Sequence, residues 1–138
     1  MERTLAIIKP DAVKRRLTGD ILKRIEASGL AVRALRLMHL TRAQAEQFYD
    51  VHKARPFYAS LCEYMSSGPV VVTVLQGDRA IARWRELMGA TDPKKADPGT
   101  IRKEFGVDVE QNATHGSDAA ETAAREIAFF FSGSEILP

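Results

Sequence analysis

Thr4-Leu-Ala-Ile-Ile8 is a short run of β-branched and apolar residues, and Lys9-Pro10-Asp11 follows it directly. This composition predicts a buried central strand. Pro10 marks its end, because proline lacks the N–H group that a strand ladder requires. Residues 70–75 are almost entirely apolar and predict another strand, one that is buried on both faces. A sheet built around these two strands is the expected core.

The segments around these strands alternate between helical and extended patterns. Gly29 stands where a helix C-terminal cap is expected, and Thr41-x-x-Gln44 is a capping box that opens a helix. Asp78 is expected to cap a helix that Gly89 ends. The expected helices are 19–28, 42–52, 57–65, 78–88, 100–105 and 119–130, with further strands at 30–40 and around His115 and a loop over 90–99.

This order of elements predicts an α+β fold of the ferredoxin-like βαββαβ type, with additional helices. The expected architecture is a four-stranded antiparallel sheet covered by helices, and helices on one face are the economical arrangement. The chain has 138 residues, a length that fits a single domain over 1–138. No internal repeat, low-complexity segment or linker divides it.

Composition restricts the classes of partner. The hydrophobic share of 45% and the charged share of 28% are typical of a soluble globular protein. The net charge of +2 does not indicate a dedicated nucleic-acid partner, although Lys14-Arg15-Arg16 forms a local basic stretch. Cys62 is the single cysteine and is expected to be a small, partly buried apolar residue. The N-terminal apolar run is too short for a signal peptide or a membrane span, so we expect a cytoplasmic protein with no membrane partner.

Asn112-Ala-Thr-His-Gly-Ser-Asp118 is the segment with the clearest chemical potential. An unperturbed imidazole has a pKa near ~6.5, so a neutral His115 could attack an electrophile such as phosphorus. Glu126 follows on the last expected helix and could hold the imidazole in one tautomer, although an ordinary surface acid fits the same position. Asp118 could cap that helix with Glu121 at the third position, which is compatible with a water-mediated metal contact.

Phosphate binding would have to rely on side chains, because the sequence contains no G-x-x-x-x-G-K-[ST] loop and no G-x-G-x-x-G turn. Lys9, Arg85, Thr91 and Arg102 together offer an ammonium group, a hydroxyl and two guanidinium forks, which suit a polyphosphate. Each basic residue taken alone is better explained as a solvated surface charge. Only their convergence on one site would make them ligands.

Aromatic residues near the middle of the chain suggest a platform for a base. Phe57 follows Pro56 at a junction between loop and helix and could stack on a planar ligand, although core packing explains it as well. Tyr49 and His52 are about one helical turn apart and could share a face, with helix packing as the alternative. His39 lies within an expected strand and is interpreted as structural.

Taken together, these motifs resemble the nucleoside diphosphate kinase family from end to end. The resemblance rests on His52-Lys-Ala-Arg-Pro-Phe57, on Asn112–Asp118, and on further segments at residues 2–13, 67–72, 87–93, 98–102 and 124–127. It implies a ping-pong reaction in which a nucleoside triphosphate, mainly ATP, gives its γ-phosphate to His115. A nucleoside diphosphate then takes the phosphoryl group from the histidine.

The resemblance also implies roles for individual residues. Nδ1 of His115 would be the nucleophile, with Glu126 holding the other ring nitrogen and Ser117 supporting the histidine. Asn112 would contact the ribose. Mg²⁺ would arrive with the nucleotide, with Asp118 as an outer contact through water. The implied catalytic residues are Lys9, Tyr49, His115, Ser117 and Glu126, and the implied nucleotide-binding residues are Lys9, His52, Phe57, Arg85, Thr91, Arg102, Val109 and Asn112.

Family members form homo-oligomers, as hexamers or tetramers and sometimes dimers, and a hexamer or tetramer is expected here. A catalytically idle relative acting as a scaffold is the alternative, but every position expected for chemistry is filled. The chain departs from the family at Ala119, where many relatives have serine, and at Trp84, which is bulkier than the usual residue. Trp84 is expected to pack against a neighbouring helix or subunit surface. The short tail after Phe131 is similar to that of bacterial members.

Overall fold

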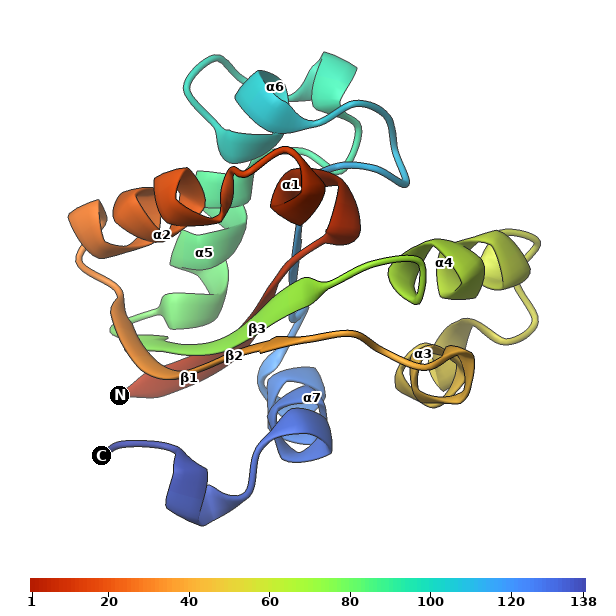
Figure 1. Cartoon of the computed structure of the whole chain (residues 1–138). Coiled ribbons are helices and arrows are strands. Elements are labelled where there is room, and N and C mark those ends of the chain that lie inside the picture. Colours follow the sequence, from red (N-terminus) through yellow and green to blue (C-terminus); the bar gives the residue numbers. More distant parts are fainter.

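The centre of the molecule is a four-stranded antiparallel sheet, seen in a computed structural model that describes residues 1–138 (Figure 1). Its strands are β1 (Glu2–Ile8), β2 (Ala31–Met38), β3 (Val70–Gly77) and β4 (Thr114–Gly116), in the spatial order β2-β3-β1-β4. Ile7 of β1 lies opposite Val72 on one side and His115 on the other. The expected ferredoxin-like fold is thus confirmed, and the predicted central strand carries the sheet.

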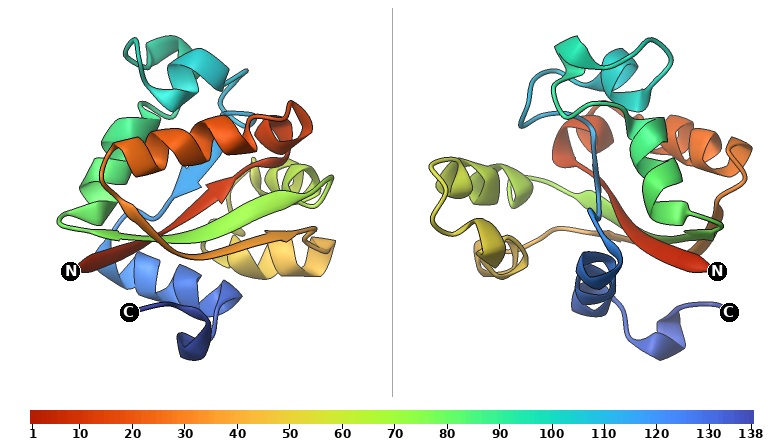
Figure 2. Two further views of the ribbon diagram at one scale, coloured as in Figure 1. Left: turned by 60° about the vertical axis from the view of Figure 1, so that its left-hand side comes forward. Right: turned by 180° about the vertical axis from the view of Figure 1, so that it is seen from behind.

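Helices cover both faces of the sheet, so the expectation of helices on one face is wrong (Figure 2). The reason lies in β1 and β3, whose side chains are apolar on both faces and therefore need cover on both. One face carries α2, α5 and α6 and the other carries α3, α4 and α7. The helices are α1 (Pro10–Lys14), α2 (Thr18–Ala27), α3 (Arg42–Phe48), α4 (Tyr58–Met65), α5 (Ala80–Met88), α6 (Ile101–Phe105) and α7 (Ala120–Phe130), with 3-10 turns η1 (Asp50–His52), η2 (Pro93–Lys95) and η3 (Gly133–Glu135).

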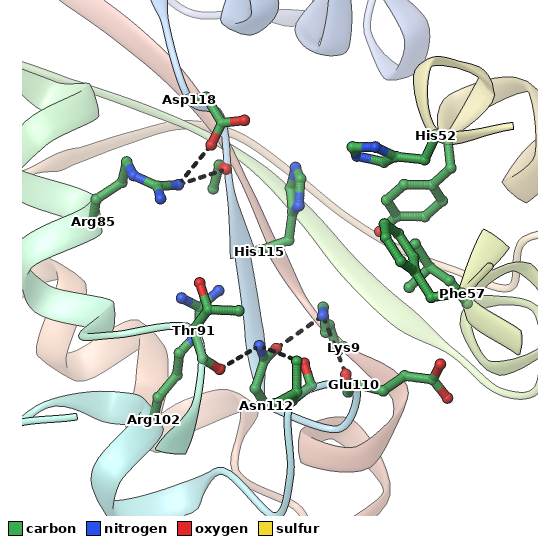
Figure 3. A pocket seen from close by; sticks show the side chains of 14 residues that line it. Lys9, His52, Phe57, Arg85, Thr91, Arg102, Glu110, Asn112, His115 and Asp118 are labelled. Atoms are coloured by element: carbon green, nitrogen blue, oxygen red, sulfur yellow. Dashed lines mark hydrogen bonds and ion pairs between the residues drawn. The ribbon is translucent and has the colours of Figure 1, made fainter. Parts of the chain in front are cut away.

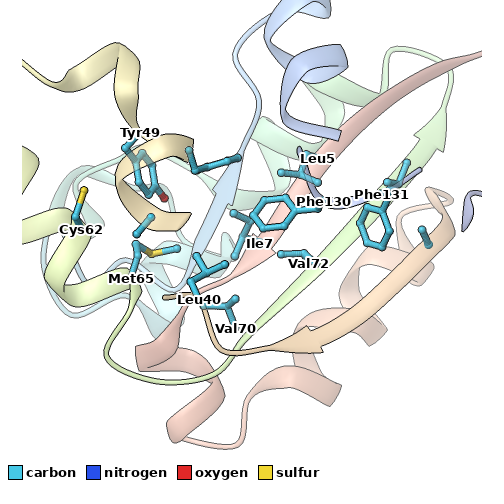
Figure 4. Packing of buried hydrophobic residues seen from close by; sticks show 14 residues of the cluster. Leu5, Ile7, Leu40, Tyr49, Cys62, Met65, Val70, Val72, Phe130 and Phe131 are labelled. Carbon is cyan, nitrogen blue, oxygen red and sulfur yellow. The ribbon is translucent and has the colours of Figure 1, made fainter. Parts of the chain in front are cut away.

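Two apolar cores follow from the alternation of side chains along the strands. Leu5 and Ile7 point into the core under α3, α4 and α7, together with Phe130 (Figure 4). Ala6 and Ile8 point into the opposite core with Trp84. Because both cores are closed, the sheet is a rigid support for the residues at its strand ends.

Several local predictions are confirmed. The Thr41 hydroxyl accepts from the amide of Gln44, and the Gln44 side chain accepts from the amide of Thr41, which completes the capping box. Gly29 and Gly89 follow α2 and α5 with φ of 90° and 86°, a region where glycine avoids steric cost. Cys62, which was expected to be a partly buried apolar residue, is fully buried.

Other local predictions are wrong at helix ends. Asp78 does not cap α5: Arg79 is the N-cap residue, and the carboxylate of Glu2 accepts from the amide of Ile81 instead. Asp118 does not cap α7, whose N-cap residue is Ala119 with no side-chain bond. A β1 side chain that is remote in sequence therefore replaces the local cap of α5. Asp118 instead pairs with Arg85, and α7 has no side-chain cap.

The remaining differences concern helix lengths. The helix expected over 42–52 ends at Phe48 and continues as the separate turn η1. Helix α1 was not predicted, although Pro10 occupies the first helical turn, where its missing N–H costs nothing. No helix of the structure is long and apolar enough to cross a membrane.

Candidate active site

A cavity of about 560 Å³ opens where β1 and β4 meet the loops that follow α5 and α6. This volume suits a small-molecule ligand. The side chains that line it come from elements far apart in the chain and point toward one space (Figure 3). The lining residues are Lys9, Tyr49, His52, Phe57, Leu61, Arg85, Thr91, Arg102, Val109, Glu110, Asn112, His115, Gly116 and Asp118. Every residue predicted for the site is among them except Ser117 and Glu126, which lie behind His115.

His115 stands on β4 with one ring nitrogen held from behind. Nε2 lies 3.0 Å from Oε1 of Glu126 on α7, and the Ser117 hydroxyl donates to the same oxygen over 2.8 Å. Burial by itself raises the pKa of Glu126, but the hydrogen bonds and charges around it outweigh burial and lower that pKa. An ionised Glu126 accepts a hydrogen bond from the N–H at Nε2 of His115. Because the neutral ring carries only this one N–H, Nδ1 has a free lone pair.

The aromatic rings of Phe48 and Tyr49 limit the movement of the imidazole. Their centroids lie 5.5 Å and 6.3 Å from that of His115, and both rings are edge-on to it. Edge-to-face packing at these distances is favourable. Tyr49 also belongs to the cavity lining, and its hydroxyl is buried without a hydrogen-bond partner.

Lys9 and Asn112 form the floor of the cavity. The ammonium group of Lys9 donates to Oδ1 of Asn112 over 2.8 Å and to the carbonyl of Glu110 over 3.3 Å. The side-chain amide nitrogen Nδ2 of Asn112 donates to the backbone carbonyls of Thr91 and Val109. Burial, with a contribution from Arg102, lowers the pKa of Lys9 to about 8. A cation that is costly to keep charged in this way gains strongly from an anionic ligand.

Arg102 and Arg85 add two further positive charges. Arg102 is buried and donates to the carbonyls of Gly89 and Thr114, and its Nε has no partner. Burial, together with the charge of Arg85, lowers the pKa of Arg102 to about 10. Lys9, Arg85 and Arg102 therefore converge around one space, and such convergence suits a polyphosphate.

The mouth of the cavity offers two exposed apolar groups. Phe57 is 47% exposed and Val109 is 56% exposed, and both belong to the lining together with His52 and Leu61. The rings of His52 and Phe57 lie 5.4 Å apart. Exposed aromatic surface beside a cationic floor is the arrangement that a nucleotide needs, because its base can stack while its phosphates reach the cations.

Comparison with known proteins agrees with this geometry. Residues 2–136 match the family model described as nucleoside diphosphate kinase. The chain belongs to the nucleoside diphosphate kinase family. It is 61% identical over 136 residues to a nucleoside diphosphate kinase of Desulfovibrio desulfuricans, covering 99% of this chain and 98% of that protein. It is 62% identical to one of Acidiphilium cryptum, covering 99% and 97%.

Solved structures of nucleoside diphosphate kinases have the same fold. The enzyme of Aquifex aeolicus superposes with a TM-score of 0.96 at 48% identity, and the match covers 99% of each chain. The enzyme of Halobacterium salinarum, solved in complex with CDP, gives a TM-score of 0.95 at 41% identity and covers 99% and 91% of the two chains. The family assignment makes this chain a nucleotide-using phosphotransferase, as the sequence predicted.

The sequence resemblance implied Mg²⁺, and the residues of the cavity fit an ion that arrives on phosphates. The structure has no group of three His, Cys, Asp or Glu side chains that could enclose a metal. Asp118 and Glu110 are the only carboxylates in the lining. Mg²⁺ commonly binds through one or two carboxylates, water and substrate phosphates. Asp118 currently pairs with Arg85, with Nη1 and Oδ1 2.9 Å apart.

Some residues of this nucleoside diphosphate kinase site were not predicted. Glu110 has no signal of its own, whereas Leu61 lies one helical turn after Phe57 and could have been found by that spacing. Trp84 was noticed in the sequence, but its position beneath β4 was not predicted. It was expected to pack against a neighbouring helix or subunit surface. The structure shows it fully buried beneath β4, where its indole fills the space that the missing side chain of Gly116 leaves.

Proposed function

We propose that this protein transfers the γ-phosphate of a nucleoside triphosphate, mainly ATP, to a nucleoside diphosphate by a ping-pong mechanism through a phosphohistidine on His115. The observation that carries the proposal is the contact between Nε2 of His115 and Glu126, 3.0 Å long, at the edge of a cavity lined by three cations. It leaves Nδ1 as the nitrogen with a free lone pair.

In the first half-reaction, Nδ1 attacks the γ-phosphorus. A nitrogen–phosphorus bond forms, the bond from phosphorus to the β,γ-bridging oxygen breaks, and the diphosphate leaves with that electron pair. The positive charge that develops on the imidazole is balanced by Glu126, which Ser117 orients. The second half-reaction is the reverse, with another diphosphate as the attacking group.

Lys9, Arg85, Thr91 and Arg102 bind the phosphates in this proposal, and Tyr49 and His52 line the phosphate end. The transferred group carries charge spread over its oxygens, so fixed cations are the main source of catalysis. Mg²⁺ would neutralise phosphate charge, and Asp118 would hold it through water. Asn112 contacts the ribose, while Phe57 and Val109 enclose the base. Stacking favours no particular base, so other nucleoside triphosphates should also serve as donors.

The decisive experiment is incubation of the pure protein with γ-labelled ATP. We expect an acid-labile, base-stable label that moves onto added diphosphate. The label should be absent in His115→Ala and present in His39→Ala, since His39 contacts the carbonyl of Ser66 outside the cavity. A label that persists in His115→Ala would remove His115 from the proposal. A comparison of four triphosphate donors under the same conditions tests the tolerance for bases.

We extend the proposal to a homo-oligomer, either a hexamer or a tetramer. Its support is β2, an edge strand of the sheet on which Leu35 and Leu37 are 52% and 67% exposed. Unpaired strand edges with exposed apolar side chains favour association. Light scattering on the purified protein gives the subunit number, and a monomer at micromolar concentration would exclude this extension.

A further inference from the structure

Ala113 has an unusual backbone conformation next to the proposed nucleophile. Its φ is 74°, and it is one of three residues other than glycine with positive φ. Alanine is strained there because its Cβ crowds the neighbouring peptide. The residue is fully buried and lies between Asn112 and the strand that carries His115. Strain of this kind persists only where the surroundings enforce it, and it is concentrated at functional sites.

Three hydrogen bonds hold this strained residue in place. The amide of Ala113 donates to Oδ2 of Asp11 over 3.1 Å, and its carbonyl accepts from the amide of Lys9 over 2.9 Å. The amide of Thr114 donates back to the carbonyl of Asn112 over 2.9 Å, which closes a tight turn around Ala113. Asp11 is the only side chain among these partners. It is buried and 102 residues away from Ala113 in the chain.

Tyr64 fixes Asp11 from the other side. Its hydroxyl donates to Oδ1 of Asp11 and accepts from the amide of the same residue over 3.1 Å. Burial, reinforced by Asp11, raises the pKa of Tyr64, so the phenol remains a donor at neutral pH. Each oxygen of the Asp11 carboxylate therefore has one assigned partner, the phenol on one side and the strained peptide on the other.

The turn around Ala113 determines where two site residues point. Asn112 precedes it and holds Lys9, and His115 follows it by two residues (Figure 3). A relaxed turn would rotate the peptides that carry both side chains. Misplacement by about 1 Å can reduce a rate by about 10²-fold.

We propose that Asp11 is a positioning residue, which holds Ala113 in its strained conformation and thereby aligns His115 with the phosphate subsite. The inference rests on the proposed function, because it assigns Asp11 to the same transfer step. It predicts a specific coupling. Glycine adopts positive φ without strain, so a protein with Ala113→Gly should not need Asp11.

The test is a double-mutant cycle with Asp11→Ala, Ala113→Gly and the double variant. The readouts are the single-turnover rate of enzyme phosphorylation at saturating ATP and the Kd for ADP. We expect Asp11→Ala to slow phosphorylation by roughly 10-fold or more, with a smaller rise in the Kd for ADP because the peptide of Asn112 also shifts. The double variant should return to within about 3-fold of Ala113→Gly alone.

Two controls separate positioning from other effects of Asp11. Asp11 also raises the pKa of Lys9 by its charge, and Asp11→Asn removes that charge while retaining an oxygen that can accept from Ala113. It should keep more activity than Asp11→Ala. Ala96→Gly, at a buried alanine with φ of −74°, should not rescue Asp11→Ala.

The outcomes are distinct. An unchanged rate of phosphorylation in Asp11→Ala overturns the inference. A reduced rate in Asp11→Ala that Ala113→Gly fails to restore also overturns it. Should Asp11→Ala not fold, the same cycle with Asp11→Asn decides between these results. Absence of phosphorylation in the unmodified protein would instead refute the proposed function.

Discussion

The indole N–H of Trp84 donates to the carbonyl oxygen of His115 over 3.1 Å, which joins α5 to β4. The contact is close because residue 116 is glycine. A Cβ at Gly116 would lie 2.6 Å from Cδ1 of Trp84 and 2.6 Å from Cε of Met88. The backbone of the proposed nucleophile thus rests directly on a buried tryptophan.

Trp84→Phe should retain most of the packing and remove this hydrogen bond. Loss of one buried donor, with the small cavity it leaves, should lower the free energy of unfolding by about 1–3 kcal/mol. We expect a few-fold lower kcat with little change in the Kd for ADP, because no phosphate ligand is touched. Met88→Leu changes the packing below Gly116 without removing a hydrogen bond and is the matched control. Equal kcat losses in both variants would show that packing alone matters.

The pH dependence of nucleotide binding should report on Lys9. Its pKa is about 8 in the folded protein and 10.5 in the reference state. Phosphates favour the ammonium form, so affinity for ADP should be full below pH 8 and should fall by up to about 10-fold per pH unit above it. Calorimetric titrations between pH 6.5 and 9.5 measure this. Lys9→Met should bind weakly at every pH, whereas Lys103→Met, at an exposed position on α6, should behave like the unmodified protein.

The free energy of unfolding of the nucleotide-free protein should rise over the pH range in which the affinity for ADP falls. Because the folded pKa of Lys9 lies below the unfolded value, the cost of burying its charge is fully present below pH 8. It disappears as pH rises from 8 to 10.5. Lys9→Met should therefore raise the free energy of unfolding of the nucleotide-free protein at pH 7, by up to about 3 kcal/mol. A lower Tm for Lys9→Met at pH 7 would contradict the prediction that the buried charge of Lys9 destabilises the folded protein.

These predictions depend on contacts that the sequence reveals unequally. The sheet was predictable because residues 4–8 and 70–75 are almost entirely apolar or β-branched. The same pattern implied that helices cover both faces of the sheet, and the prediction of helices on one face did not take this into account. The capping box at Thr41 was predictable because both of its bonds are local. Caps supplied from elsewhere, such as Glu2 on α5, leave no local signal.

In the candidate site, too, the sequence reveals some contacts and not others. Family motifs placed Lys9, Arg85 and Arg102 in one site, but their spacing alone could not bring them together. The contacts of Trp84 with His115 and of Asp11 with Ala113 join residues 31 and 102 positions apart. Neither contact belongs to a motif with a fixed spacing, so only the folded chain reveals it.

Removal of Glu126 should affect both rate and acid stability. Glu126→Ala leaves Nε2 of His115 without its partner, and we expect phosphorylation to slow by roughly 10²-fold. The pKa of Glu126 in the folded protein is lowered from 4.5. Its contribution to stability is therefore present above pH 4.5 and lost as pH falls through the lower folded value. Glu126→Ala should accordingly show a smaller loss of Tm on acidification than the unmodified protein.

Two variants control this experiment. Glu126→Gln keeps an oxygen for Nε2 and Ser117 and should lie between the other two proteins in rate. Glu121→Ala removes an exposed acid from the same helix and should change neither property. A rate for Glu126→Ala equal to that of Glu121→Ala would exclude orientation of His115 by this carboxylate.

Asp118→Asn should release Arg85 for phosphate. In the present structure Arg85 pairs with Asp118 and also contacts the carbonyl of Gly116. With EDTA present, the variant should bind ADP about 2–5-fold more tightly, since Arg85 no longer has a competing carboxylate. The gain in affinity on adding Mg²⁺ should be smaller than in the unmodified protein. Titrations with and without Mg²⁺ measure both changes, and weaker binding in EDTA would show that the pair does not compete with phosphate.

Phe57→Ala should weaken the binding of all nucleotides to a similar extent. Stacking of a base on an aromatic ring contributes about 1–3 kcal/mol and depends little on the base. We therefore expect the Kd values of ADP, GDP, CDP and UDP to rise roughly in parallel, by about 10-fold or more, with little change in the phosphorylation rate at saturation. Leu137→Ala removes a comparably exposed apolar side chain outside the cavity and should leave all four values unchanged. A loss confined to one or two bases would mean that base edges, rather than the face of the ring system, are read at this end of the cavity.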